Sequence, residues 1–316
     1  MSRHADSSRV CVIGGANIDI CGQSVATLRS YDKNPGHVRM SAGGVARNVA
    51  ENLARLGVPT RCISAIGDDV FGQMLIGDSD RAGVDTEFVF RMTDAPTPIY
   101  MSILDQHGEM QLAVSDTSAI AMLGPDQLDA CRSAIEDSVL TIVDTNLSAD
   151  ALDWIGAAKL HGPIFADTVS VAKAPQLRPL LSRVHTLKTG VDEAAALVEM
   201  PATLDQLEPL AARLHELGVK RVYVTRGREG VYCSTGNVQG IYGLADADLG
   251  VRNTSGAGDA FLAGLAYAWV AQLPQNETLQ FALHAAALAV AHTSTINPNI
   301  SVAAIEDLMM QTTNGR

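Results

Sequence analysis

The stretch NTSGAGDAFLAGL, residues 253–265, places one carboxylate where a glycine-rich turn meets a long apolar run. Gly256, Ala257 and Gly258 are small enough to let the backbone approach a ligand, and a helix that begins here would point free N–H groups outward. Such a turn could stabilise charge on a phosphoryl group in transfer, while Asp259 accepts a proton from an attacking hydroxyl. The alternative is that Asp259 only favours the helix N-terminus by its charge and that the glycines serve close packing.

Two further polar sites lie in the N-terminal part of the chain. In SAGGVARNVAENLARLG, Gly43 and Gly44 precede an expected helix that carries Asn48, and the Arg-Asn pair at its start would suit the hydroxyls of a sugar. A tight turn into an ordinary amphipathic helix explains this pattern as well. In GGANIDI, Asn17 and Asp19 leave the end of the first expected strand. This stretch lacks the third glycine of G-x-G-x-x-G, and the chain has no G-x-x-x-x-G-K-[ST], which argues against a nicotinamide-dependent oxidoreductase and a P-loop enzyme.

The elements that must position these residues alternate between strands and helices. Apolar runs such as VLTIVDTN, PIFADTV, VHTLKTG and RVYVTRG are separated by helical patterns such as ALDWIGAAKL and LAARLHELGV. The alternation predicts an α/β fold with a doubly wound, mainly parallel sheet and helices on both faces. The stretch TPIYMSILDQHGEMQLAVSDT departs from it and predicts a β-hairpin around residues 106–109, a candidate lid over a site at the carboxyl ends of the strands.

Composition excludes several classes of protein. A net charge of −12 with no basic run argues against a nucleic-acid partner. No segment approaches the roughly 18 to 20 apolar residues of a membrane span. The five cysteines are scattered and include no CxxC pair, so neither a disulfide framework nor a zinc site is expected. We expect a cytoplasmic protein.

The motifs together resemble the two signature regions of the PfkB or ribokinase-like carbohydrate kinase family. The resemblance runs from about Val10 to about Thr295, and within the family it is strongest to the pseudouridine kinase branch. The stretches that carry it are GGANIDI, DKNPGHVRMSAGGVARNVAENLARLG, LDQHGEMQLAVSD, ADTVSVAK, VHTLK and NTSGAGDAFLAG. It implies a single ribokinase-like kinase domain over residues 1–316, with lid strands from about 17–42 and 95–117.

The resemblance also implies a reaction and a substrate. ATP would phosphorylate the 5′-hydroxyl of pseudouridine to pseudouridine 5′-phosphate, with Asp259 as base and the backbone of residues 256–258 as anion hole. The residues implied to hold the nucleoside are Asn17, Asp19, Gly43, Gly44 and Asn48 at the ribose, and Tyr100, Ser102 and Asp116 in the lid over the base. A homodimer through the lid strands is implied as well, for which the charged hairpin tip gives no independent support.

For the nucleotide, the family's strand and loop along ATP fall on VTRGREGVY, with Thr225, Gly227 and Gly230 at the matching positions. A polar surface turn would use the same residues. The monovalent cation common in the family, here K⁺, would lie near Asn253, Ser255 and the loop HTSTINPN. Asn253 stands where a carboxylate is often found.

The Mg²⁺ motif of the family is incomplete. Its Asn-x-x-Glu pattern falls on residues 190–193, where Glu193 is retained to hold Mg²⁺ through water but Gly190 replaces the asparagine. Asp192 could substitute in part, and Thr168 stands where related kinases have a proline. The departure keeps open a nucleoside-binding regulatory protein with weakened catalysis. A kinase of ribose or of another nucleoside is the other alternative, because the lid alone selects the base.

Several polar residues have simpler explanations. His284 and His292 lie in a mostly apolar helical run and are expected in the core or at the edge of the nucleotide site. The pair Asp68 and Asp69 is typical of a helix cap. The stretch VDTNLS, residues 143–148, ends a strand, so its Asp and Asn could touch substrate or cap the helix of ALDWIG.

Overall fold

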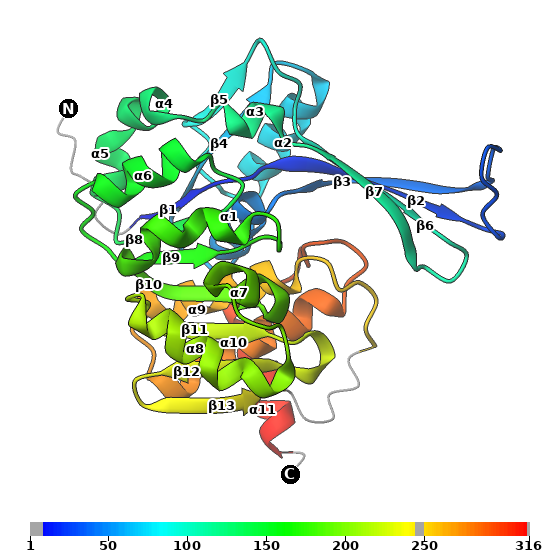
Figure 1. Cartoon of the computed structure of the whole chain (residues 1–316). Coiled ribbons are helices and arrows are strands. Elements are labelled where there is room, and N and C mark those ends of the chain that lie inside the picture. The colour runs from blue at the N-terminus through cyan, green and yellow to red at the C-terminus, as the bar shows by residue number, and fades with distance from the viewer. Residues whose placement is uncertain (1–8, 244–249, 315–316) are drawn as a thin grey trace.

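The computed structural model describes residues 9–243 and 250–314, and it consists of a large helix-covered sheet with a smaller sheet projecting from it (Figure 1). The large sheet has nine strands in the order β13-β12-β11-β10-β9-β8-β1-β4-β5, and its pairs are parallel except β11/β12 and β12/β13. The strands are β1 (Val10–Ile13), β4 (Thr60–Gly67), β5 (Val89–Met92), β8 (Leu140–Asp144), β9 (Ile164–Asp167), β10 (Val184–Gly190), β11 (Arg221–Thr225), β12 (Val231–Thr235) and β13 (Val238–Tyr242). The predicted doubly wound, mainly parallel sheet is confirmed.

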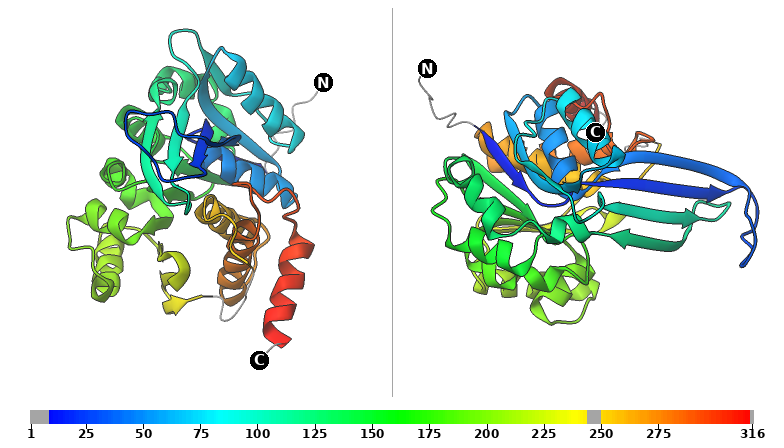
Figure 2. Two further views of the ribbon diagram at one scale, coloured as in Figure 1. Left: turned by 90° about the vertical axis from the view of Figure 1, so that its right-hand side faces the viewer. Right: turned by 90° about the horizontal axis from the view of Figure 1, so that it is seen from above.

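Helices cover both faces of the large sheet (Figure 2). Alternate residues of β1 point into different cores: Val10 and Val12 pack with α1, α9 and α10, whereas Cys11 and Ile13 pack with the helices of the opposite face. On the first face lie α1 (Val45–Arg55), α9 (Ala257–Val270) and α10 (Gln275–Val290), with α11 (Val302–Asn314) packed on α10. The core of the opposite face includes residues of α3 (Ser118–Ala121), α4 (Pro125–Ala130), α5 (Arg132–Glu136), α6 (Ala149–Ala157), η1 (Ala174–Arg183), α7 (Val191–Val198) and α8 (Leu207–Glu216), which follows η2 (Leu204–Gln206). Within the described ranges, no helix has both the length and the apolar character that a membrane span requires.

Helices α9 and α10 pack in close contact. A Cβ added at Gly264 would lie 2.7 Å from the Cα of Ala282, so the two backbones approach more closely than any larger residue would allow. Both helices are apolar on most sides, as expected for helices buried between a sheet and other helices. This packing fixes the start of α9, which carries the glycine-rich motif.

The sheet reverses its winding at β1, because the chain passes from β1 to β4 and β5 on one side and later from β8 to β9, β10 and β11 on the other. In such sheets the crevice outside the carboxyl ends of the strands at this reversal is the usual ligand site. The first strand ends at Ile13, and Asn17 and Asp19 belong to the next strand, β2. Both residues therefore follow the end of the first strand, as expected. The chain turns at Gly14, with φ of 154°, and a Cβ there would lie 2.4 Å from the Asp144 carboxylate.

The small sheet has the order β3-β2-β6-β7 and extends away from the body as an arm (Figure 1). Its strands are β2 (Asn17–Ser24), β3 (Gly36–Gly43), β6 (Ile99–Leu104) and β7 (Met110–Asp116), and α2 (Val70–Arg81) packs at its base. The predicted hairpin is present as β6 and β7, which pair antiparallel around a turn in which Asp105 N donates to Glu109 O at 3.0 Å.

The register gives the small sheet two different faces. Asp19, Tyr100 and Ser41 are register partners on one face, which is mostly polar. The other face is apolar and remains exposed along the outer part of the arm, where the exposed side chains are Val38, Met40, Met101, Leu112 and Val114.

Candidate active site

The glycine-rich turn begins with Gly256, the N-cap of α9. Its φ is 80°, and a Cβ there would lie 2.1 Å from the Thr295 carbonyl oxygen, so only glycine fits. Asp259 follows in the first turn and is 8% exposed. Its Oδ2 accepts a hydrogen bond of 2.8 Å from Asn48 Nδ2, which reaches across from α1. The motif of the C-terminal part and the Gly-Gly helix of the N-terminal part therefore meet at one carboxylate.

The environment of Asp259 brings its ionisation close to neutral pH. Burial above all, together with the nearby Asp167 carboxylate, raises the pKa of Asp259 to about 7, although Lys188 and the hydrogen bond from Asn48 act in the opposite direction. A carboxylate that only stabilised the helix N-terminus would have no reason to be buried beside another acid. A pKa near the working pH is what a general base requires.

Lys188 is a candidate site residue that the sequence analysis did not single out. It lies at the end of β10, where its Nζ is 2.9 Å from Asp167 Oδ2, and the two side chains are 12% and 1% exposed. Burial favours a lower pKa for Lys188, but the carboxylates of Asp167, Asp259 and Glu193 outweigh it and raise the pKa, so the ammonium group stays charged. A Cβ on Gly258 would lie 2.8 Å from Lys188 Nζ, so this glycine leaves room for the ammonium group at the start of α9. The signal available in the sequence was a lysine directly after the buried run of VHTLK.

Asp144 organises the reversal point of the sheet. Its carboxylate accepts hydrogen bonds from the backbone N–H groups of Gly15 at 2.9 Å, Ala46 at 3.0 Å and Asn146 at 2.8 Å. Burial raises the pKa of Asp144 to about 6 although these N–H groups favour the charged form. The proposed cap of α6 was wrong, because Ser148 caps that helix, and Asp144 instead joins the first turn of α1 to the end of β1.

The neighbouring Asn146 has a partner of its own. Lys173 Nζ donates to Asn146 Oδ1 at 2.6 Å, and burial lowers the pKa of Lys173. The pair lies beside the turn after β1, since a Cβ on Gly15 would be 2.5 Å from Asn146 Nδ2. It extends the polar surface at the carboxyl ends of β1 and β8.

The candidate ribose residues form a compact group at the start of β2. Asn17 Nδ2 donates to Asp19 Oδ1 at 2.6 Å, and a Cβ on Gly43 would lie 2.2 Å from Asp19 Oδ2. Gly44, the N-cap of α1, has φ of 96°, and a Cβ there would meet Gly15 O at 2.4 Å. Burial raises the pKa of Asp19, while Asn17 and Arg47 oppose the shift. Gly43 thus leaves room for the Asp19 carboxylate, and Gly44 lets the start of α1 approach the turn after β1.

Arg47 forms its ion pair within α1, although the Arg-Asn pair had suggested a role at a sugar. Its guanidinium forms an ion pair with Glu51 one turn further along α1, and the Arg47 side chain is 6% exposed. Glu51 also pairs with Arg55 at 2.7 Å. Arg47 therefore stabilises the helix, and Asn48 alone of the pair reaches Asp259.

The three lid residues do not share one face of the small sheet. Tyr100 is the register partner of Asp19, and Ser102, two residues along β6, lies on the same face. Asp116 is the register partner of Ile99 and therefore lies on the opposite face, where its Oδ1 accepts from Ser118 N at 2.9 Å. The register brings Tyr100 and Ser102 toward the ribose group and separates Asp116 from it.

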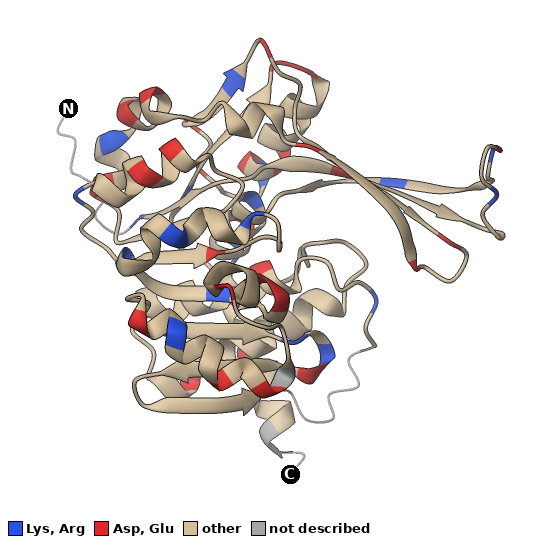
Figure 3. Ribbon diagram, in the orientation of Figure 1, with Lys and Arg blue, Asp and Glu red and all other residues tan. Residues whose placement is uncertain are grey.

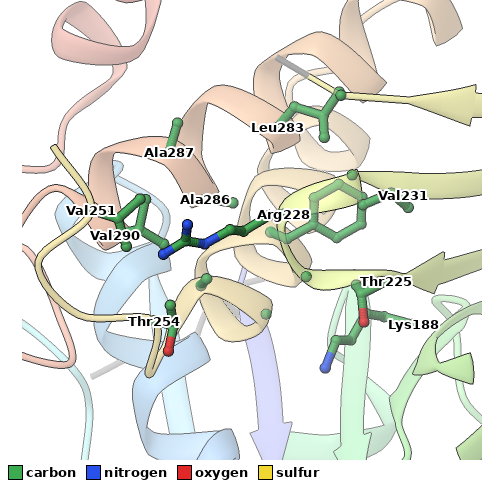
Figure 4. Close-up of a pocket in the computed structure, with 16 residues that line it drawn as sticks. Lys188, Thr225, Arg228, Val231, Val251, Thr254, Leu283, Ala286, Ala287 and Val290 are labelled. Atoms are coloured by element: carbon green, nitrogen blue, oxygen red, sulfur yellow. The ribbon is translucent and has the colours of Figure 1, made fainter. Parts of the chain in front are cut away.

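A cavity of about 580 Å³ lies between the β11–β12 turn and helices α9 and α10 (Figure 4). Thr225, Gly227 and Gly230 all line it, as the nucleotide prediction requires. The turn, η3 (Gly227–Glu229), connects two antiparallel strands, so the polar hairpin turn considered as the alternative is present as well. The remaining lining residues are Lys188, Arg228, Val231, Gly243, Val251, Thr254, Ala257, Gly258, Phe261, Leu283, Ala286, Ala287 and Val290. Lys188 and the start of α9 form its polar end, and the valines, Phe261, Leu283 and the alanines of α10 form its apolar part.

Glu193 is held in place despite the missing asparagine. Gly190 N donates to Glu193 Oε2 at 2.9 Å, and the Thr168 hydroxyl donates to the same carboxylate. The hydroxyls of Thr168 and Thr189 are 2.9 Å apart. A Cβ on Gly190 would lie 3.3 Å from Glu193 Cδ, so a larger residue there would press on the carboxylate. Thr168, the residue that stands in place of the family's proline, therefore positions Glu193.

The loop predicted to hold a monovalent cation is closed by its own hydrogen bonds. Asn253 Nδ2 donates to Thr293 O at 3.2 Å, and Asn253 Oδ1 accepts from Ser255 N at 2.9 Å. These contacts tie the segment before α9 to the loop after α10. They bring Asn253 and Ser255, two residues predicted at the cation site, close to the backbone carbonyl of Thr293.

His284 and Asp69 have the structural roles expected of them. His284 is buried between Gln280 O and the Thr312 hydroxyl, at 2.7 and 2.9 Å, which confirms a core histidine. Asp69 caps α2 by accepting from Gly72 N at 2.9 Å, as predicted, whereas Asp68 pairs with Arg91 instead.

Comparison with known proteins agrees with this geometry. A family model described as pfkB family carbohydrate kinase matches residues 7–302. The pseudouridine kinase of Escherichia coli (strain K12) is 35% identical over 302 residues, which cover 95% of this chain and 96% of that protein. The structure of a carbohydrate kinase from Agrobacterium tumefaciens has a TM-score of 0.83 at 30% identity and covers 96% of this chain and 97% of its own. A putative ribokinase II from E. coli, solved with ATP and Mg²⁺, has a TM-score of 0.82 at 21% identity, with coverage of 96% and 99%.

Proposed function

Because the chain belongs to the pfkB family of carbohydrate kinases, we propose that it transfers the terminal phosphoryl group of ATP to the 5′-hydroxyl of a nucleoside, and that this nucleoside is pseudouridine. The observation that carries the proposal is the buried Asp259, whose pKa is raised to about 7 by burial, at the start of α9. The similarity to a pseudouridine kinase supports the substrate.

In this mechanism Asp259 accepts the proton of the 5′-hydroxyl as the hydroxyl oxygen attacks the terminal phosphorus. A new P–O bond forms to the nucleoside, the bond between that phosphorus and the bridging oxygen breaks, and ADP leaves with the electron pair. Asn48 keeps the carboxylate oriented through its hydrogen bond of 2.8 Å. Lys188 and the backbone N–H groups at residues 256–258 would stabilise the charge that develops on the phosphoryl oxygens.

The ribose would be held by Asn17, Asp19 and Asn48, since carboxylate and amide groups can bridge vicinal hydroxyls. Gly43 leaves the space for Asp19 that this grouping needs. Tyr100 and Ser102 would close over the base from the polar face of the small sheet. Asp116 is left out of the proposed contacts, because its register places it on the opposite face.

ATP would occupy the cavity lined by Thr225, Gly227 and Gly230, with its phosphates toward Lys188. Mg²⁺, when bound, offsets charge on the phosphates. Among the described residues no cluster of three or more His, Cys, Asp or Glu side chains could hold a metal, so one protein carboxylate with waters and phosphate oxygens fits the ion best. Glu193 is that carboxylate, acting through water.

Three further expectations belong to the proposal. K⁺ would bind at the loop of Asn253 and Ser255, near the carbonyl of Thr293. The location would be cytoplasmic, supported by five free cysteines, of which four are buried. The chain would form a homodimer through the small sheet, whose apolar face exposes 60% of Leu112 and 62% of Val114. Charged residues of this arm gather mainly at its tips (Figure 3), and an exposed apolar face of this kind commonly marks a protein interface.

The test measures ADP release with Mg²⁺ and ATP for pseudouridine, uridine, cytidine, adenosine, ribose and a sugar phosphate, beside Asp259→Asn. We expect a strong response to pseudouridine that the substitution removes. A response to another ribosyl compound would support the kinase activity but show that its substrate is not pseudouridine. No response from any compound, with nucleosides still bound, would favour the regulatory alternative.

A further inference from the structure

The nucleotide cavity contains a second cation, Arg228, whose position differs from that of Lys188. Figure 4 shows the Arg228 side chain reaching across the cavity, with its guanidinium group directed toward Val251 and Val290 and away from Lys188. Lys188 is fixed at the phosphate end by Asp167 and by its close approach to Gly258. The guanidinium group therefore faces the apolar part of the cavity.

The turn that carries Arg228 is held rigidly. Arg226 N donates to Gly230 O at 2.8 Å, and Glu229 N donates to Arg226 O at 3.1 Å. Gly230 has φ of 88°, and a Cβ there would lie 2.2 Å from the carbonyl oxygen of Tyr242. Because the backbone cannot move without disrupting these contacts, only rotation of the Arg228 side chain changes what it touches.

Within the described ranges, Arg228 has no ion pair or hydrogen bond of its side chain. The one acid of the same turn, Glu229, is bound to Arg226 at 2.5 Å. A guanidinium group has a flat face that is weakly hydrated and packs on aromatic rings. Since the guanidinium group lies toward Val251 and Val290 (Figure 4), the planar group that would complete its surroundings is an aromatic ring.

We propose that Arg228 stacks its guanidinium plane on the purine base of the phosphate donor and thereby sets the affinity for the nucleotide. This inference rests on the proposed function, because it needs ATP in the cavity with its phosphates at Lys188. The apolar part of the cavity contacts one face of the purine, and Arg228 covers the other. The role concerns binding, so the chemical step is left to Asp259 and Lys188.

The experiment measures the dissociation constants of ADP and ATP, with Mg²⁺, by isothermal titration calorimetry at two salt concentrations. The proteins are the wild type, Arg228→Ala, Arg228→Lys and the control Arg213→Ala, which removes an exposed arginine of α8 that pairs with Glu216. Thermal unfolding of each variant establishes that it is folded. Steady-state kinetics with saturating ATP supply kcat.

We expect Arg228→Ala to raise both dissociation constants by the same factor, about tenfold, with kcat unchanged. Arg228→Lys should recover only a small part of the affinity, because an ammonium group has no flat face. Equal affinities in the wild type and Arg228→Ala would overturn the inference. The inference would also be overturned if Arg228→Ala lost more affinity for ATP than for ADP, lost more affinity at low salt than at high salt, and if Arg228→Lys restored that affinity. Together these results would mark a contact with a phosphate group. A wild type that binds neither nucleotide would refute the proposed function together with this inference.

Discussion

Replacing Asp259 by asparagine should separate catalysis from binding. Asparagine keeps the size of the side chain and can still offer an oxygen to Asn48 Nδ2, 2.8 Å away in the wild type. It cannot accept the proton of the substrate hydroxyl. We expect kcat to fall by about 10²- to 10⁴-fold, the usual contribution of a general base, while the dissociation constant of the nucleoside changes little.

The same substitution has a calculable effect on stability. The pKa of Asp259 is raised by burial from 3.8 to about 7, so the folded protein favours the protonated carboxyl group. The stability that this provides is complete below the unfolded pKa and is lost as pH rises through the folded pKa. Relative to Asp259→Asn, which does not titrate, the wild type should lose about 2 to 3 kcal/mol of unfolding free energy between pH 5 and pH 8.

Urea denaturation of both proteins at these two pH values measures the difference, and ADP release between pH 5 and pH 9 measures the activity. The base must be ionised, so kcat/KM of the wild type should fall below about pH 7, near the pKa of Asp259. The reasoning would be refuted by a flat pH profile, by unfolding free energies with the same pH dependence in both proteins, or by equal losses of nucleoside binding and turnover.

Three further perturbations test other parts of the site. Lys188→Met should shift the acid limb of kcat/KM to higher pH, because Lys188 lowers the pKa of the base, and an unchanged limb would contradict this. Thr168→Val should raise the Mg²⁺ concentration for half-maximal rate severalfold without changing the nucleoside KM, because Glu193 loses a hydroxyl donor; identical titrations would show that Thr168 does not position the carboxylate. Gly190→Asn, which places a Cβ 3.3 Å from Glu193 Cδ, is compared with Thr168→Val. It would lower the Mg²⁺ concentration for half-maximal rate only if the absence of the asparagine amide impairs Mg²⁺ use in the wild type. Leu112→Asp should convert a dimer to a monomer in analytical ultracentrifugation, and a wild-type monomer or an unaffected dimer would refute the interface.

Local patterns in the chain were enough to predict the elements and the chemistry of one motif. Period-two and helical spacing of apolar residues identify strands and helices without knowledge of their neighbours, which is why the mainly parallel sheet and the hairpin could be predicted. Gly256 and Gly258 indicate that other atoms come close to the backbone at these positions, because a residue without a side chain is needed where such an approach leaves no room for a Cβ. These features depend on residues within a few positions of one another.

The assembly of the site depends on the order of the strands, which no short pattern encodes. Asn48 and Asp259 are 211 positions apart and meet because α1 and α9 cover the same face of the sheet. That Asp144 accepts a hydrogen bond from the first turn of α1, and does not cap α6, became clear only because β8 lies beside β1. A lysine at the end of a strand becomes a phosphate-binding candidate when parallel neighbours bring an acid and a helix start to it. Burial then sets the ionisation of these groups, and burial is a property of the packed molecule.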